Sequence, residues 1–514
     1  MERYLNDAYI PTAPDLTDRT SSLLASMSQE KVDLHDSKAE SLRDLRTPED
    51  DSSSLSSEET KALLRRIDLR LMPIMMACWT LQFIDKVVLN YANIMGLQKD
   101  TGLKGDQFAW LATGFFIAFS IFQLPGMYIL ARTPVNLFLP CLLLLCGIAV
   151  ACTAACKNFP SLMTVRVFLA IGESGLGTSL SLVTMKWYTR KEASKRYGIW
   201  YCGLGIGQIL GGIMSFGFQH VRRGSFGSWR GMFLATAMIN LLVAAWTFLA
   251  LPDNPTTAKF LTPKERAFLT RRLLMENKYV VTANRFDISQ IVSTLKSDST
   301  IWLIFLICAA CVLQSGAVTS FSATIIAGFG YNSKEAALLN MPSGVVSIIS
   351  SLVATWFIES NVPMSLAILL LVVPSVTGAS LLSFAKAKAA LLAGIWLINV
   401  VTPILIVATA WAQANCAGHT KRVFYNAVTM VAFGVANICA PQTYRAKDAP
   451  NYWPAKVTMV VATASCGLFT LMLLGVYVVR NRKQRSTPPE YDTKDDINGN
   501  EKTDLELPGF RYVY

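Results

Sequence analysis

The chain has 514 residues, of which 52% are hydrophobic and 16% are charged, and its formal net charge is +12. The apolar residues fall in runs of about 20 residues, which is the length that a helix needs to cross the core of a bilayer. This pattern excludes a soluble enzyme, a nucleic-acid-binding protein and a disordered scaffold, because the charges lie mostly between the runs.

The N-terminal segment 1–64 is acidic and polar. Its first 60 residues hold 14 Asp or Glu and only 6 Lys or Arg. Such a segment lacks the apolar surface that a folded core requires, so we predict a disordered cytosolic tail. The polar stretch 481–514 is predicted to be a second cytosolic tail.

Twelve apolar runs are predicted to be transmembrane helices. They cover residues 71–95, 107–130, 136–156, 160–184, 197–219, 231–251, 300–325, 335–358, 364–386, 388–412, 422–442 and 455–479. The longest polar interruption separates two sets of six, which is typical of a two-halved transporter. The sequence therefore predicts an all-α membrane protein, with six-helix bundles at 65–251 and 300–480 and a cytosolic central loop at 252–299.

The distribution of Lys and Arg predicts the orientation. If the N-terminus is cytosolic, the cytosolic segments carry 24 Lys or Arg and the outer segments carry 12. Cytoplasmic loops are enriched in these residues, so both termini are predicted to be cytosolic. An outer cluster of Arg222, Arg223 and Arg230 goes against the rule.

The 11 cysteines lie mostly inside apolar runs, where we interpret them as small apolar packing residues. Cys308 and Cys311 have the spacing of a redox or metal pair, but they lie in an apolar helix with no His nearby. No metal site and no cofactor are expected.

Two predicted spans carry ionisable residues: Asp85 and Lys86 in the first, Arg166 and Glu173 in the fourth. Such residues are costly inside a membrane and mark substrate or ion pathways. Arg166 and Glu173 are seven residues apart, so they share one helix face, about 10 Å apart along the axis.

The first span also has a polar stripe. Gln82, Lys86 and Asn90 recur at every fourth residue. The helical rise places Lys86 between Glu173 and Arg166 in height, so the two polar faces would surround a site near the middle of the membrane. Two cations and one carboxylate would suit an anionic substrate, with the carboxylate free to carry a proton.

Two other arrangements remain open. The pairs Arg166–Glu173 and Asp85–Lys86 could neutralise each other and have a structural role only. Asp85 could also point about 100° away from Lys86 and contact a different helix.

The fifth span is rich in glycine, with Gly207, Gly211 and Gly212 in its middle. Small residues at four-residue spacing allow close helix approach, so we interpret these glycines as packing residues. They would also allow the helix to slide or bend in a rocking transporter.

Five segments resemble one family of membrane transporters. They are Phe-Ile-Asp-Lys at 83–86, the helix 166–175, Trp-Tyr-x-Arg-x-Glu at 187–192 followed by Arg196, Leu-Pro-Asp-Asn-Pro at 251–255 continued by 259–266, and Gly-His-Thr-Lys-Arg at 418–422 continued by 437–450. In this order they resemble the major facilitator superfamily, and more narrowly its fungal anion:cation symporter branch of the allantoate permease type.

The resemblance implies proton-coupled import of a small organic anion, such as allantoate or nicotinate. In related transporters a cation of the first helix and the Arg of the fourth hold the carboxylate, and the Glu is protonated. The candidate substrate ligands are Lys86, Asn90, Arg166 and Gln82, and the candidate proton-coupling residues are Glu173 and Asp85. The candidate gating or helix-packing residues are Trp187, Arg190, Glu192, Arg196, Gly207, Gly211, Gly212, His419 and Lys421.

The chain departs from the branch at several positions. Gln123 stands where the branch commonly has Glu. Lys86 stands where the branch commonly has Arg, so a point charge replaces a bidentate fork. The segment 207–212 keeps the glycines of an antiporter motif but lacks its Pro. Import is therefore favoured, and proton-antiport efflux of a specialised metabolite and a non-transporting nutrient sensor are the alternatives.

We expect a monomer in the plasma membrane, with the substrate, protons and the bilayer as its partners.

Overall fold

The computed structural model describes residues 55–221, 228–281, 288–360, 362–417, 419–445, 448, 452–483, 504 and 510–514. Most of the predicted disordered tail at 1–64 and most of the predicted cytosolic tail at 481–514 lie outside these residues. The chain divides into two units, Met1–Thr60 and Lys61–Tyr514. Twelve helical segments of the described chain are long and apolar enough to cross a membrane, which confirms the predicted number.

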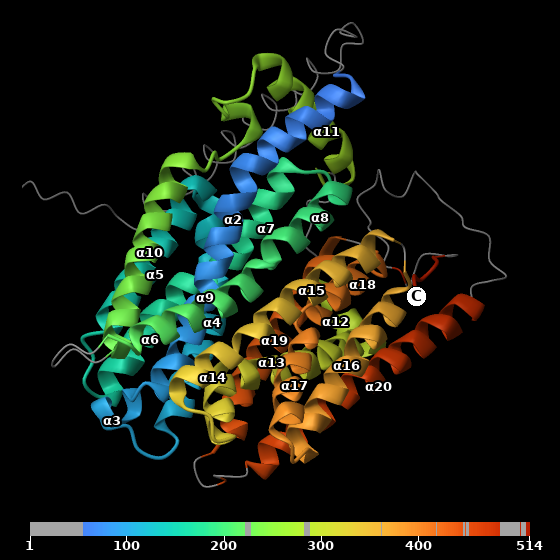
Figure 1. The fold of residues 1–514 in the computed structure, drawn as a ribbon. Coiled ribbons are helices and arrows are strands. Elements are labelled where there is room, and N and C mark those ends of the chain that lie inside the picture. The colour runs from blue at the N-terminus through green and yellow to red at the C-terminus, as the bar shows by residue number, and fades with distance from the viewer. Residues whose placement is uncertain are drawn as a thin grey trace, which may run out of the picture. The chain divides into compact units, whose positions relative to one another are not determined.

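The first six spans are gathered together, and so are the last six (Figure 1). The helices of the first set are α2 (Ser57–Ile94), α4 (Gln107–Arg132), α5 (Val135–Thr153), α6 (Phe159–Ser174) with α7 (Leu176–Trp187), α8 (Arg190–Tyr201) with α9 (Gly203–Phe218), and α10 (Ser228–Ala250). A short helix, α3 (Leu97–Thr101), follows α2. We call this set the N-half.

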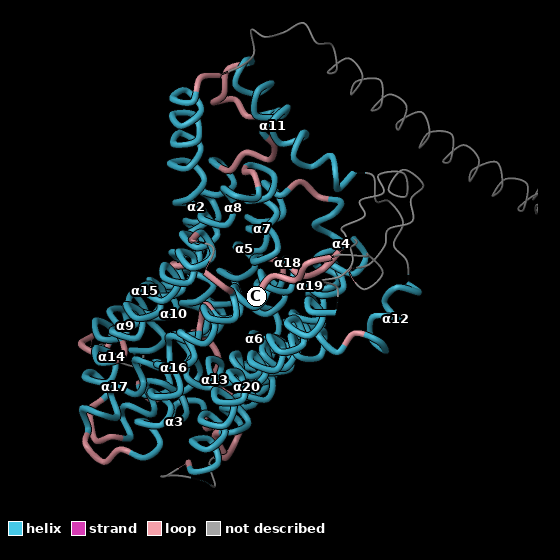
Figure 2. Tube along the Cα trace, turned by 90° about the vertical axis from the view of Figure 1, so that its right-hand side faces the viewer, coloured by secondary structure: helices cyan, strands magenta, loops and turns pink. Residues whose placement is uncertain are grey.

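The second set, the C-half, begins with α13 (Ser299–Gly328). Its other helices are α14 (Ser333–Leu339) with α15 (Met341–Glu359), α16 (Met364–Phe384), α17 (Lys388–Ile398) with α18 (Ile404–Ala414), α19 (His419–Cys439) and α20 (Trp453–Lys483). Across the described residues the elements are helices and loops, without a strand (Figure 2).

Two boundaries differ from the sequence prediction. α2 begins at Ser57, so residues 57–64 are helical and do not belong to a disordered tail. Ser56 and Glu59 explain this start, because each side chain bonds the other's backbone N–H, at 3.2 and 2.8 Å. This capping box satisfies amide groups that the first turn of a helix leaves free. The predicted central loop also contains two helices, α11 (Pro263–Val281) and α12 (Ile288–Ser297).

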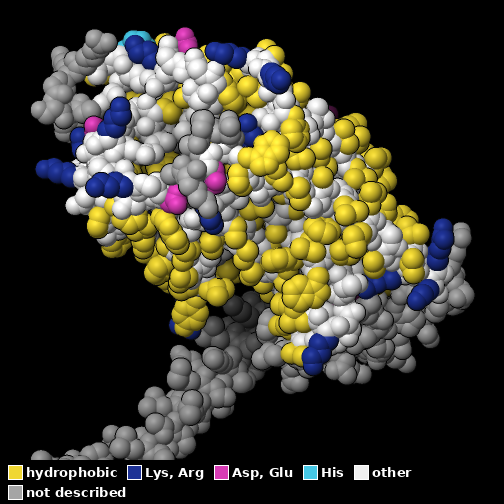
Figure 3. Space-filling view, turned by 90° about the horizontal axis from the view of Figure 1, so that it is seen from below, with side chains coloured by type: hydrophobic (Ala, Val, Ile, Leu, Met, Phe, Trp, Pro, Cys, Tyr) yellow, Lys and Arg dark blue, Asp and Glu magenta, His cyan; other side chains and the backbone are white. Residues whose placement is uncertain are grey.

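The membrane-spanning unit has two ends. We call the end where α20 ends and where α11 lies the tail face, and we call the opposite end, where α3 and α14 lie, the loop face (Figure 1). Between these ends, apolar side chains cover much of one side, and Lys and Arg gather toward its margins (Figure 3). This distribution is what a lipid-facing surface requires.

The two halves are hydrogen-bonded to each other at the loop face. Asn340, which precedes α15, donates from Nδ2 to the hydroxyl of Tyr91 in α2 at 3.0 Å. Ser333 donates from Oγ to the backbone oxygen of Ile94 at 2.9 Å. The structure is therefore closed at the loop face.

Toward the tail face, α4 separates from the C-half. Its loop-face part packs on α19, where Phe119 lies 6.2 Å from Phe433 between ring centroids. Beyond Ser120 its side chains become exposed on most sides: Leu124 is 74% exposed and Tyr128 59%. The ring and glycine contacts of α4 with α19 thus lie in the loop-face half of α4, up to Ser120 beside Gly434.

The fifth span is packed between α2 and α15, and its glycines make this possible. A Cβ at Gly207 would lie 2.8 Å from the backbone oxygen of Thr80 in α2, and a Cβ at Gly212 would lie 2.9 Å from that of Ala337. Gly211 faces the ring of Tyr91 at 3.1 Å in the same way. These close approaches agree with the interpretation of the glycines as packing residues.

This packing predicts that Gly212→Ala lowers the stability of the purified protein. The added methyl would meet a backbone oxygen that cannot rotate away, and overpacking of this kind costs about 1–3 kcal/mol. Gly217 of the same helix is a matched control, because a Cβ there meets nothing within 4 Å. Gly217→Ala should leave the thermal unfolding temperature in detergent unchanged or raise it. Equal unfolding temperatures for the two variants would contradict the packing argument.

Candidate functional site

An ion pair between two helices of the N-half lies at the centre of the predicted site. Lys86 of α2 places Nζ 2.7 Å from Oε2 of Glu173 in α6. The Glu173 side chain is fully buried, and that of Lys86 is 19% exposed. Gln82 donates from Nε2 to the backbone oxygen of Glu173 at 3.4 Å. The polar stripe of the first span therefore meets the polar face of the fourth, as the depths predicted.

Arg166 lies buried beside this pair. Its side chain is 3% exposed, and Nη1 donates to the backbone oxygen of Asp85 at 3.4 Å. Nε and Nη2 are buried without a hydrogen-bond partner among the residues that the structure describes. A buried donor without a partner is costly, so an anion that supplies oxygens here would be favoured.

Asp85 faces away from Lys86. Its carboxylate accepts from Nδ2 of Asn240 in α10, at 3.0 Å to one oxygen and 3.4 Å to the other. The arrangement found is therefore the one in which Asp85 contacts a different helix. Lys86 pairs across helices with Glu173 and not with its sequence neighbour.

Asn90 lies one turn of α2 beyond Lys86, at the interface between the halves. Its side-chain amide is 3.0 Å from the hydroxyl of Ser322 in α13, and this contact persists if the amide is turned over. Asn90 thus bonds the C-half near the loop face and lies outside the Lys86–Glu173 pair.

Aromatic rings face the Lys86 ammonium group. Its Nζ is 5.8 Å from the ring centroid of Phe115 and 6.0 Å from that of Phe119, both on α4. Cations are attracted to the faces of aromatic rings at such distances. Phe433 of α19 adjoins Phe119, so both halves contribute to this aromatic surface.

The candidate gating residues of the N-half lie at the tail face. Arg196 forms a bidentate pair with Asp68, at 2.6 and 2.8 Å. Glu192 pairs with Arg272 of α11 at 2.7 Å. Trp187 is fully buried and stacks on the ring of Phe260, with centroids 5.9 Å apart. The side chains of Arg190 and His419 lie outside the described residues.

The C-half has a similar but more buried cluster at the tail face. Lys421 at the start of α19 is 2.7 Å from a carboxylate oxygen of Asp298 and 2.7 Å from one of Asp504. Arg480 of α20 is also paired with Asp298, at 2.8 Å. Burial alone would raise the pKa of Asp298, but the charges of Lys421 and Arg480 outweigh it and hold that pKa well below its usual range.

Residues 510–514 dock onto the C-half beside this cluster. Asn481 of α20 binds both the backbone N–H and the backbone oxygen of Tyr512, at 2.9 and 2.8 Å. Asn415 does the same for Val513, at 2.6 and 2.9 Å. The Tyr512 ring stacks on Tyr477 with centroids 5.1 Å apart. This part of the predicted tail is therefore packed against the helices.

Sequence reasoning found Lys421 but missed Asp298 and Asp504. Both carboxylates lie outside the apolar runs, where an acidic residue is ordinary and gives no signal. The described residues contain no group of three or more His, Cys, Asp or Glu that could hold a metal. Cys308 and Cys311 are free and buried in α13.

Comparison with known sequences settles the family. The sequence profile of the Major Facilitator Superfamily matches residues 75–441. The chain belongs to this superfamily, and it is a membrane transporter rather than an enzyme. One relative, the thiamine pathway transporter THI73 of Saccharomyces cerevisiae, is 32% identical over 89% of this chain and 87% of its own length. The allantoate permease of the same yeast is 29% identical, with the same two coverages.

Solved structures agree on the fold. The proton:xylose symporter XylE, bound to 6-bromo-6-deoxy-D-glucose, aligns with a TM-score of 0.60 at 12% identity. The alignment covers 79% of this chain and 95% of that one. At this identity the likeness concerns the arrangement of the helices alone.

The buried charge cluster of the C-half predicts that Asp298→Asn destabilises the protein by about 3 kcal/mol at neutral pH, since one partner of a buried pair is removed. Because the pKa of Asp298 lies below its unfolded value, this stabilisation is present at neutral pH and is lost only as the pH falls below about 4. Thermal unfolding of wild type and variant should therefore differ at pH 7 and converge in acid.

The control for this measurement is Asp253→Asn. Asp253 pairs with Lys186 at 3.3 Å, and both side chains are partly exposed, at 21% and 29%. A pair that water reaches contributes less than a buried one, on the order of 1 kcal/mol. An equal loss in both variants would show that burial of the Asp298 cluster does not set its strength.

Proposed function

We propose that this transporter carries a small organic anion together with a proton, by alternating access. The observation that carries the proposal is the buried Lys86–Glu173 pair beside Arg166, whose two unfilled donors lie in the same region. A second carboxylate, Asp85, lies nearby, but it is bonded to Asn240, and no ion pair to Arg166 is present among the described residues. A carboxylate substrate would supply the missing acceptors.

The proposed cycle follows from competition for Lys86. A substrate carboxylate that reaches Lys86 and Arg166 displaces Glu173 from its ion pair. A buried carboxylate without a cation is costly, so Glu173 then takes up a proton. Substrate and proton cross together. After the substrate leaves, Lys86 attracts Glu173 again, and the proton is released.

The substrate class rests on the charges and the aromatic surface. With Glu173 protonated, Lys86 and Arg166 carry one positive charge more than Asp85 balances, which favours an anion. The rings of Phe115 and Phe119 favour a substrate with an apolar or planar body beside its carboxylate. The name of one relative, allantoate permease, denotes an anion transporter, whereas that of another, a high affinity cysteine transporter from the same yeast, denotes a different substrate. We therefore propose a small carboxylate and leave its identity to a competition screen.

We further propose that the tail face is cytosolic, that the membrane is the plasma membrane, and that the protein acts as a monomer. The bias of Lys and Arg supports this orientation. Closure at the loop face would then make this structure an inward-facing state. An epitope inserted near residue 270 should be inaccessible to antibody in intact cells, and surface labelling there would reverse the orientation.

Uptake by Lys86 variants separates a binding role from a structural one. Lys86→Gln should abolish saturable uptake, because the substrate carboxylate loses its buried cation, which costs several kcal/mol. The double variant Lys86→Gln with Glu173→Gln removes the ion pair without leaving an unpaired charge. It should remain unable to bind substrate. Recovery of counterflow in the double variant would show that Lys86 only neutralises Glu173. Lys99→Gln on the loop face is the control for charge removal and should leave uptake unchanged.

A Glu173→Gln variant tests the coupling step. Glutamine mimics the protonated side chain, so the variant should bind substrate and exchange it across the membrane in counterflow. It should not concentrate substrate when the outside is acidified, because it carries no exchangeable proton. Glu359→Gln, at an exposed carboxylate that ends α15, should accumulate substrate normally. Accumulation by Glu173→Gln in proportion to the pH gradient would remove Glu173 from the mechanism.

A further inference from the structure

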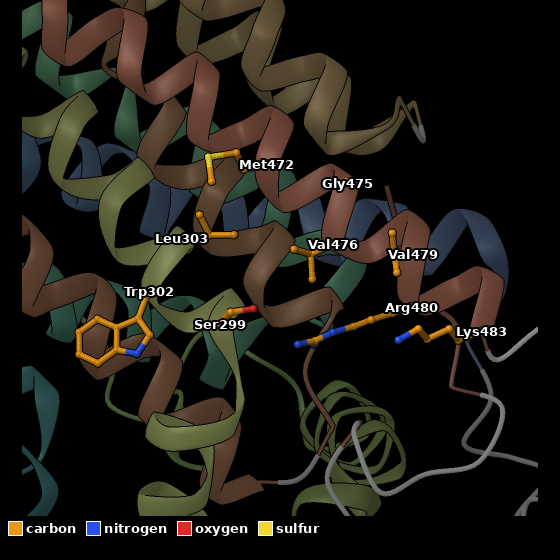
Figure 4. A pocket seen from close by; sticks show the side chains of 9 residues that line it. All are labelled: Ser299, Trp302, Leu303, Met472, Gly475, Val476, Val479, Arg480 and Lys483. Atoms are coloured by element: carbon orange, nitrogen blue, oxygen red, sulfur yellow. The ribbon is translucent and has the colours of Figure 1, made fainter.

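A groove lies between the tail-face ends of α13 and α20 (Figure 4). Its volume is about 770 Å³, within the range of sites that hold a small organic molecule. Leu303 of α13 and Met472, Val476 and Val479 of α20 line its length. Met472 and Val479 are 50% and 52% exposed, so the apolar wall opens outward to the side that lipid covers.

The level of this groove in the membrane is marked by its neighbours. Trp302 at its edge is 52% exposed and donates from Nε1 to the backbone oxygen of Leu295 in α12 at 3.3 Å. Val292 and Leu295 of α12 are themselves 45% and 38% exposed. Exposed Trp residues and short helices with an apolar face lie where hydrocarbon meets headgroups. The groove therefore runs from the headgroup level into the apolar layer.

Two basic side chains stand at the headgroup end. Arg480 and Lys483 extend from successive turns of α20 along the edge of the groove (Figure 4). Arg480 is paired with Asp298 through Nη2, and its side chain remains 18% exposed along the groove. The cluster of Asp298, Asp504, Lys421 and Arg480 is neutral as a whole. The exposed Lys483 is therefore a surplus positive charge at the groove.

We infer that this groove binds one anionic phospholipid of the leaflet at the tail face. The phosphate and the acidic headgroup lie against Lys483 and the edge of the Arg480 side chain that lines the groove, and one acyl chain follows Leu303, Met472 and Val476. Basic pockets between transmembrane helices at the headgroup level bind acidic lipids in this way. The site is separate from the Lys86–Glu173 pair, and it does not depend on the proposed substrate.

Native mass spectrometry of the purified full chain tests the site, with phosphatidylserine and phosphatidylcholine as probes. The wild type should retain one phosphatidylserine in preference to phosphatidylcholine. Lys483→Gln should weaken retention about fivefold, the effect of one basic residue near an anionic surface. Met472→Trp fills the apolar wall without changing charge and should also release the lipid.

The matched control is Arg482→Gln. Arg482 is exposed and adjacent to Lys483 but does not line the groove, so its loss should leave retention within twofold. Four results would overturn the inference: equal retention of the two lipids, retention unchanged by both groove variants, an equal effect of Arg482→Gln, or displacement of the lipid by inorganic phosphate at millimolar concentration. The last would assign the basic edge to free phosphate.

Discussion

A charge buried inside a membrane protein must find a counter-charge, and here the partners lie on different helices. Glu173 is fully buried against Lys86, and Lys421 is 1% exposed between two carboxylates. Leaving either without its partner would cost several kcal/mol. The pairs therefore fix which helices are neighbours, α2 with α6 in the middle and α13 with α19 and α20 at the tail face. Arg166 is a buried cation with two donors that have no partner among the described residues, which is why the functional proposal centres on it.

The two halves use the same pairing at the tail face. Asp68 near the start of the first span pairs with Arg196 of the fifth, and Asp298 before the seventh pairs with Lys421 of the eleventh. Each pair thus joins corresponding spans, as expected of a chain built from two structural repeats. The pair in the C-half is more deeply buried, because residues 510–514 pack beside it and Asp504 adds a second carboxylate.

The sequence was sufficient for the number of spans and for placing Lys86 and Glu173 at similar depths. Span length is set by the bilayer, and the depths of Lys86 and Glu173 follow from the helical rise. It was not sufficient for the partner of each charge, since a pair within one helix and a pair between helices give the same sequence pattern. The rotation that turns Asn90 toward α13 depends on tertiary packing. Asp298 and Asp504 lie in polar segments, where hydropathy carries no information about burial.

The glycine contacts of the fifth span have a mechanical consequence. They continue along its length, from Gly198 beside Thr355 to Gly212 beside Ala337, whereas the ring and glycine contacts of α4 with α19 lie in the loop-face half of α4. If the N-half rotates against the C-half about the contacts of the fifth span, the distance between α4 and α19 changes most, because they lie farthest from this axis. Glycine has no side chain that must change rotamer during such a rotation. The resistance to opening the loop face would then reside in the ring contacts of α4 with α19 and in a few hydrogen bonds, among them that of Asn340 to Tyr91.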